Sequence, residues 1–177
     1  SSTAGDSLAF EPVSLTKLVD SPVLSGRYFR RVDLAPGSSV PYTLDMVSDA
    51  EASLAIPDSQ VAVSRSLVQE ARTLFGGGHH GEYHFLLTLS DQVPSFGLEH
   101  FESSDDRVPE RMWLEAPLRL ACADLLPHEF AHSWCGKYRR PAGLATPDYA
   151  APMRGELLWV YEGLGEYLGW VLAGRCG

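Results

Sequence analysis

The residues best suited to catalysis are two histidines and a glutamate with the spacing HExxH: His128, Glu129 and His132. Residues four apart lie on one face of a helix, so both imidazoles can reach one cation, while Glu129 can address a water on that cation. Zinc in such a site lowers the pKa of bound water toward about 7 and polarises a scissile carbonyl. A neighbouring carboxylate can take the proton and pass it to the leaving amine. The motif therefore predicts a hydrolytic zinc site with Glu129 as the general base.

A catalytic zinc usually has three protein ligands and one open position, so a third ligand is needed. The residue six positions after the second histidine is Tyr138, which excludes the pattern with a third histidine there. Glu162 lies among apolar residues of a later helical segment, where an unpaired carboxylate would be costly to bury. We expect Glu162 to be the ligand ahead of Glu156 or Asp148. The competing interpretation is an ordinary amphipathic helix that carries two histidines and no metal.

Two helices must position these ligands. The apolar run 118–135 carries the HExxH motif, and Pro127 either kinks this helix or opens a new one at its first turn. Three prolines and two glycines predict a loop over 137–155, followed by a helix over 156–173.

The second of these helices contains three glycines, Gly163, Gly165 and Gly169. Each costs about 1 kcal/mol relative to alanine in a helix, so we expect another backbone to approach closely, for example that of the HExxH helix. Glu166 lies one turn after Glu162. It either orients a ligating histidine or is a solvated charge.

The residues before the motif predict a sheet. Apolar alternation over 27–48 indicates two strands joined by a turn, and the helical spacing over 59–75 ends at three glycines. Residues 83–89 (YHFLLTL) look like a buried strand, whereas 91–110 are expected to be largely loop. Strands followed by helices predict an α+β fold with an N-terminal mixed β-sheet.

Composition excludes several classes of protein. With 14 basic and 23 acidic side chains the formal charge is −9, which argues against a nucleic-acid partner. The three cysteines lack CxxC spacing, and no apolar run approaches the roughly 18 residues of a membrane span. We expect no membrane span and a soluble protein, and the compartment, cytoplasmic or periplasmic, stays open.

The sequence HEFAHSW, followed by GKYRRP and LWVYEGLGEYLG, resembles the glycyl aminopeptidase family of gluzincins. DSPVLSGRYFR, YHFLLTLSD and FGLEHFESS extend the resemblance over nearly all of residues 18–174. It implies a thermolysin-like catalytic domain, commonly followed by a PDZ domain, in which His128, His132 and Glu162 hold Zn²⁺ and Glu129 is base and acid.

The resemblance also implies a substrate site. In related aminopeptidases a glycine-rich motif with a glutamate binds the free α-amino group of the substrate, and GLEH at residues 97–100 is the matching stretch. Glu99 would pair with the substrate ammonium, with Gly97 and His100 beside it. Phe96 stands where a glycine commonly opens that motif. The tyrosine that stabilises the tetrahedral intermediate in similar enzymes has no assignable counterpart here.

We expect residues 1–17 to be a lead-in segment or the tail of a preceding domain. Residues 18–177 are expected to be the N-terminal portion of a catalytic domain without its C-terminal helical subdomain. The expected function is a zinc aminopeptidase that removes N-terminal glycine or alanine from peptides with a free N-terminus. The alternative is a truncated or inactive zinc-binding fragment that serves as a structural or binding module. Equal cleavage of blocked and free peptides would instead indicate an endopeptidase.

Overall fold

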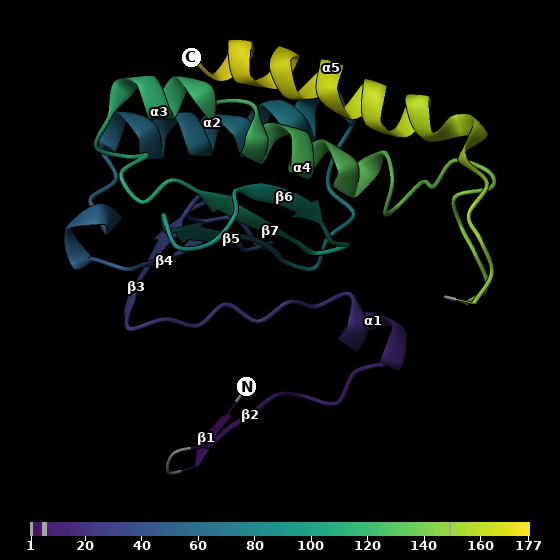
Figure 1. Cartoon of the computed structure of the whole chain (residues 1–177), viewed down its shortest axis with the longest axis horizontal. Coiled ribbons are helices and arrows are strands. Elements are labelled where there is room, and N and C mark those ends of the chain that lie inside the picture. The colour runs from purple at the N-terminus through teal and green to yellow at the C-terminus, as the bar shows by residue number, and fades with distance from the viewer. Residues whose placement is uncertain (1, 5–6, 149) are drawn as a thin grey trace.

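The computed structural model describes residues 2–4, 7–148 and 150–177, and its central element is a five-stranded mixed sheet (Figure 1). The strand order is β3-β4-β5-β7-β6. The two outer pairs, β3 with β4 and β6 with β7, are antiparallel, and the inner pairs are parallel. The strands are β3 (Tyr28–Asp33), β4 (Tyr42–Ser48), β5 (Tyr83–Leu89), β6 (Phe96–Glu99) and β7 (Ser103–Val108).

Helices cover one face of this sheet, and the N-terminal segment runs on the other side (Figure 1). The covering helices are α2 (Asp58–Leu74), α3 (Ala116–Ala121), α4 (Leu125–Trp134) and α5 (Leu158–Cys176). The remaining elements are β1 (Ser2–Ala4), β2 (Ser7–Ala9), α1 (Leu15–Val19) and two 3₁₀ turns, η1 (Glu51–Leu54) and η2 (Gly155–Leu157). Among the described residues, no helix combines the length and apolarity needed to cross a bilayer.

The hydrophobic core lies between the sheet and the helices. Alternate side chains of β4 and β5 are fully buried there, because residues two apart in a strand point to the same face. Phe130 of α4 and Leu172 of α5 pack into the same core. The helix that carries the HExxH motif is thus fixed from below by an apolar layer.

Most of the expected elements are confirmed: the strand pair in 27–48, the helix near 59–75, the strand 83–89 and the α+β class. The expectation of a loop over 91–110 is wrong, because this stretch contains β6 and β7. The buried positions of β7 include Ser104 and Asp106, so an apolar alternation is missing from the sequence although the strand is central.

The run 118–135 is two helices, since α3 ends at Ala121 and α4 begins at Leu125. Pro127 lies in the first turn of α4, where a missing backbone N–H does no harm. The expected domain boundary between residues 17 and 18 falls inside α1 and stays a prediction.

Candidate metal centre

The two histidines of the HExxH motif lie one helical turn apart on α4 and face the same point. Their Nε2 atoms are 2.9 Å apart. The Nδ1 atom of His132 lies 3.2 Å from the backbone oxygen of Cys135, so a proton on Nδ1 would be donated there and Nε2 would keep its lone pair. Burial, then the neighbouring His132, lower the pKa of His128, which favours the neutral imidazole that binds metals.

Glu162 approaches both imidazoles from α5. Its Oε2 atom lies 3.4 Å from Nε2 of His132 and 3.8 Å from Nε2 of His128. Bonds of about 2.0 to 2.1 Å in a tetrahedral site place zinc ligands roughly 3.3 Å apart, close to this triangle of atoms. The structure therefore brings together the three residues expected as ligands.

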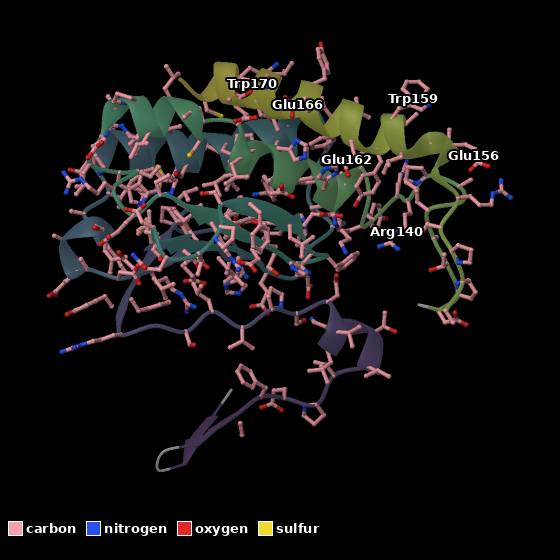
Figure 2. All side chains as sticks on the ribbon, viewed as in Figure 1. Arg140, Glu156, Trp159, Glu162, Glu166 and Trp170 are labelled. Atoms are coloured by element: carbon pink, nitrogen blue, oxygen red, sulfur yellow. The ribbon has the colours of Figure 1, made fainter. Side chains whose placement is uncertain are left out.

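The expected burial of Glu162 is wrong, because its side chain is 53% exposed. In Figure 2 Glu162 and Glu166 follow one another along α5, between Trp159 and Trp170. The apolar neighbours of Glu162 in sequence lie on other sides of the helix. Its place beside the imidazoles comes from the packing of α5 on α4.

Two of the three helix glycines explain how close α5 comes to α4. A Cβ atom on Gly165 would lie 2.6 Å from Cε1 of His132, and one on Gly169 would lie 3.1 Å from Cβ of His128. A Cβ atom on Gly163 would meet nothing within 4 Å. Close approach is thus confirmed for Gly165 and Gly169, and the expectation is wrong for Gly163.

Glu129 lies against strand β6 and is 5% exposed. A Cβ atom on Gly97 would lie 2.7 Å from Cδ of Glu129, so this position has room only for glycine. Burial, then the carboxylates of Asp106, Glu99 and Glu162, raise the pKa of Glu129 to about 9. A divalent cation nearby would oppose this effect and favour the carboxylate.

Glu129 also forms a metal-sized group with the two histidines, since one ligand atom of each lies within 4.8 Å of the others. The chain thus offers two candidate carboxylates for the same pair of imidazoles. We favour Glu162 as the ligand because its oxygen lies 3.4 and 3.8 Å from the two Nε2 atoms, close to the separation of ligands around zinc. Glu129, packed against β6, is then left to act on a substrate.

Glu166 lies on the far side of His128 from the metal position. Its Oε2 is 3.6 Å from Nδ1 of His128, and its Oε1 accepts a hydrogen bond from the indole of Trp170 at 2.9 Å. Of the two interpretations, this geometry favours a carboxylate that orients a ligating histidine.

Glu99 lies on the same face of β6 as Gly97, because the two residues are two positions apart. Its carboxylate accepts a hydrogen bond from the hydroxyl of Tyr161. The ring of Tyr161 stacks on His132 with centroids 4.6 Å apart. Glu99 is therefore linked through one tyrosine to the metal-binding pair.

Sequence reasoning missed Tyr161, although it immediately precedes Glu162. Burial, followed by the bond to Glu99, raises the pKa of Tyr161, so its hydroxyl keeps its proton. No sequence signal distinguished this tyrosine from the other six in the chain. Its stacking on His132 depends on the packing of α5.

A cavity of about 340 Å³ opens beside Glu129, away from Glu99. It is lined by His128 and Glu129 together with Phe96, Arg107, Asp124 and Glu166. The guanidinium of Arg107 lies 4.2 Å above the ring of Phe96 and 3.0 Å from a carboxylate oxygen of Asp105. The volume is in the range of small-ligand sites.

Beneath Glu129, Asp106 of β7 is fully buried. Its Oδ2 accepts a hydrogen bond of 2.6 Å from Ser104, and its Oδ1 has no partner among the residues that the structure describes. Burial raises the pKa of Asp106 to about 7, in spite of that hydrogen bond. The floor of the site thus contains a second carboxyl group that sequence reasoning missed.

The remaining histidines lie outside the metal position. His79 and His80 both contact the hydroxyl of Ser133, and His84 lies 2.8 Å from Asp45. His100 points its Nδ1 to Asp20 at 3.2 Å. In the described part of the chain, metal-ligating side chains gather in this way only around His128 and His132.

Comparisons with known proteins agree with this geometry. Residues 121–177, which contain α4 and α5, match the model of the M61 glycyl aminopeptidase family. Among solved structures, a crystal structure of an aminopeptidase N family protein from Idiomarina loihiensis superposes with a TM-score of 0.69 at 21% identity. It covers 84% of this chain, which spans 25% of that protein's length. No curated protein matches the chain significantly.

Because the structural match covers 84% of the chain, the similarity of fold extends upstream of residue 121. The family match falls on the two helices that bring His128, His132 and Glu162 together. The match supports the resemblance seen in the sequence: residues 121–177 are similar to the M61 glycyl aminopeptidases, a family of peptidases.

Proposed function

We propose that this chain is the zinc-binding catalytic part of a thermolysin-like (gluzincin) aminopeptidase, which removes N-terminal glycine or alanine from peptides. The observation that supports this most is the triangle formed by His128, His132 and Glu162 within a segment that matches a peptidase family. The fold of the aminopeptidase N family protein agrees with it.

The donor atoms suit zinc. Two imidazole nitrogens and one carboxylate oxygen are a common protein ligand set for catalytic zinc, which keeps a further position open. When bound there, zinc would supply Lewis acidity to the scissile carbonyl and to the attacking water. Glu166 and the backbone oxygen of Cys135 would hold the outer nitrogens of the two histidines.

Glu129 would carry the proton. Its carboxylate accepts a proton from the attacking water and delivers it to the nitrogen of the leaving amine, so the peptide bond breaks as the new acid and amine form. Its buried position against Gly97 excludes bulk water from the carboxylate. The missing side chain at Gly97 leaves the space that the Glu129 carboxylate occupies.

Glu99 would anchor the substrate. A carboxylate at a fixed distance from the metal pairs with the N-terminal ammonium and selects the first peptide bond. Glu99 and Phe96 lie at opposite ends of β6, and Phe96 lines the cavity. A peptide anchored at Glu99 would therefore pass Glu129 and place its later residues in the cavity.

Zinc analysis of matched variants tests the ligand set. We expect the purified chain to bind about one zinc, Glu162→Ala to lose it on dialysis, and Glu129→Gln to retain it, because Glu129 is assigned to proton transfer. Atomic emission measures the content. Loss of zinc from Glu129→Gln with retention in Glu162→Ala would exchange the two roles and contradict the proposal.

The alternative, a zinc-binding module without turnover, keeps the same metal site. It is favoured by the fact that the chain spans a quarter of the length of its structural relative. Hydrolysis of glycyl and alanyl chromogenic amides by the zinc-loaded chain and by a longer form separates the two functions. Turnover that Glu129→Gln abolishes supports the peptidase, and silence of both forms supports the module.

A further inference from the structure

Asp20, far from the metal motif in sequence, joins the two halves of the proposed site. It follows α1 and lies on the side of the sheet opposite α5, yet its carboxylate reaches two separate segments of the chain. One segment follows Glu99, and the other follows the HExxH helix.

Three donors converge on this carboxylate. The Oδ2 atom accepts a hydrogen bond from the backbone N–H of Phe101 at 2.8 Å. The Oδ1 atom lies 2.8 Å from Nζ of Lys137 and 3.2 Å from Nδ1 of His100. Although burial alone would raise it, the bonds from His100, Lys137 and Phe101 hold the pKa of Asp20 below its usual range. The group is thus a charged, fully engaged carboxylate.

Each of these donors is linked to a residue of the proposed site, by adjacency in the chain or by a backbone hydrogen bond. His100 and Phe101 directly follow Glu99 in the turn between β6 and β7. The backbone N–H of Lys137 donates to the backbone oxygen of His132 at 2.9 Å. Asp20 therefore connects the backbone beside Glu99 with the end of the metal-binding helix.

The separation between these two parts matters in an aminopeptidase. Glu99 must hold the substrate ammonium at one fixed distance from the metal, because the first peptide bond lies a fixed distance from the chain end. A mispositioning of about 1 Å can cost roughly 100-fold in rate. β6 is the edge strand and pairs on one side with β7, so the turn after Glu99 needs a further restraint.

We propose that Asp20 is a positioning residue that fixes Glu99 relative to the metal-binding helix, and so sets the affinity for the free α-amino group of the substrate. This rests on the proposed function, with Glu99 as the ammonium anchor. Asp20 itself touches neither metal nor substrate. Its carboxylate acts through His100, Phe101 and Lys137.

Two hydroxamates that bind zinc test this role without turnover. Glycine hydroxamate carries an ammonium, and propionohydroxamate has a methyl group in its place. Calorimetric titration of the zinc-loaded chain should show tighter binding of glycine hydroxamate. Asp20→Asn keeps an acceptor for Phe101 but loses the charge, so we expect it to weaken glycine hydroxamate about tenfold and propionohydroxamate less than about twofold.

Lys17→Ala is the matched control. Lys17 docks the same N-terminal segment through an ion pair with Glu102 at 2.5 Å, but has no link to His132. It should leave both affinities unchanged. Circular dichroism and zinc content confirm that each variant is folded and loaded.

The outcomes distinguish the proposed function from the role of Asp20. A wild-type chain that binds neither hydroxamate overturns the metal site, and one that binds both equally overturns Glu99 as the anchor. Either result also overturns the role of Asp20. A wild-type preference that Asp20→Asn retains overturns Asp20 alone. Equal weakening of both ligands in Asp20→Asn, with loss of zinc, would show a general structural role and overturn the positioning role too.

Discussion

Glu129 and Glu162 are both carboxylates beside the same two imidazoles, and their surroundings favour different tasks. Glu162 is half exposed, and its carboxylate lies near both Nε2 atoms, which suits a metal ligand. Glu129 is buried against the backbone of β6 and cannot turn toward solvent without leaving Gly97. The contact with Gly97 is therefore the feature that most directly fixes the position of Glu129, the proposed general base.

Gly97→Ala should disable catalysis and leave the metal in place. The new methyl group would lie 2.7 Å from Cδ of Glu129 and 2.8 Å from Cδ1 of Leu125, so Glu129 must move. We expect kcat/KM for glycyl amides to fall by about 100-fold or more, within the range for loss of a general base. Initial rates and zinc content measure the two effects.

A loss of zinc in Gly97→Ala would contradict the assignment of Glu129 as a residue that does not bind the metal. Unchanged activity would show that Glu129 has room to move and that its contact with β6 is unimportant.

At the scale of elements, the site depends on how closely α5 packs on α4. Gly165 and Gly169 face the histidines and are buried, whereas Gly163 faces open space. The proposed metal ligands thus lie where two helices pack together, each anchored in the core by an apolar side chain, Phe130 in α4 and Leu172 in α5.

Gly165→Ala and Gly163→Ala form a matched pair on one helix. A methyl group at position 165 would meet the ring of His132 at 2.6 Å, so we expect α5 to shift, zinc affinity to fall at least about tenfold and stability to fall by about 1 to 3 kcal/mol. At position 163 the same methyl group meets nothing within 4 Å. Alanine there should raise the free energy of unfolding by roughly 0.5 to 1 kcal/mol, because it lowers the conformational entropy of the unfolded chain.

Competition with a chromogenic chelator gives the zinc affinity, and urea unfolding gives the stability. Equal effects of the two substitutions would mean that helix packing does not control the metal site.

For the whole molecule, the buried carboxyl of Asp106 links stability to pH. Its pKa rises from 3.8 to about 7 on folding, so between these values the native state binds more protons than the unfolded state. Stability from this group therefore falls as the pH rises through that window. Burial of the Asp106 carboxyl therefore lowers the free energy of unfolding at neutral pH relative to acid pH.

Asp106→Asn should remove this dependence and keep the acceptor for Ser104. We expect the free energy of unfolding of the variant, minus that of the wild type, to grow between pH 5 and 7 by on the order of a few kcal/mol at most. Urea unfolding of the metal-free chain measures it. Asp105→Asn, on the opposite face of β7 and paired with Arg107, is the control. Asp105 is the last of the causes that raise the pKa of Asp106, after burial, so this variant should show a much smaller trend. A difference that does not change with pH would contradict the raised pKa.

The sequence by itself determined the parts of this protein that depend on local spacing. Four-residue spacing placed His128 and His132 on one helix face, apolar alternation predicted β3 and β4, and the apolar run YHFLLTL predicted β5. It failed at β6 and β7, because their inward positions include Gly97, Ser104 and Asp106, which serve the site instead of the core.

Only the tertiary structure decided which residues from distant segments meet. The stacking of Tyr161 on His132, its bond to Glu99 and the reach of Asp20 to Lys137 join residues separated by 29 to 117 positions. Glu162 is half exposed, although its neighbours in the sequence are apolar. Local periodicity fixes the face on which a side chain lies, whereas its partners across the fold depend on how helices pack on the sheet, which no short pattern encodes.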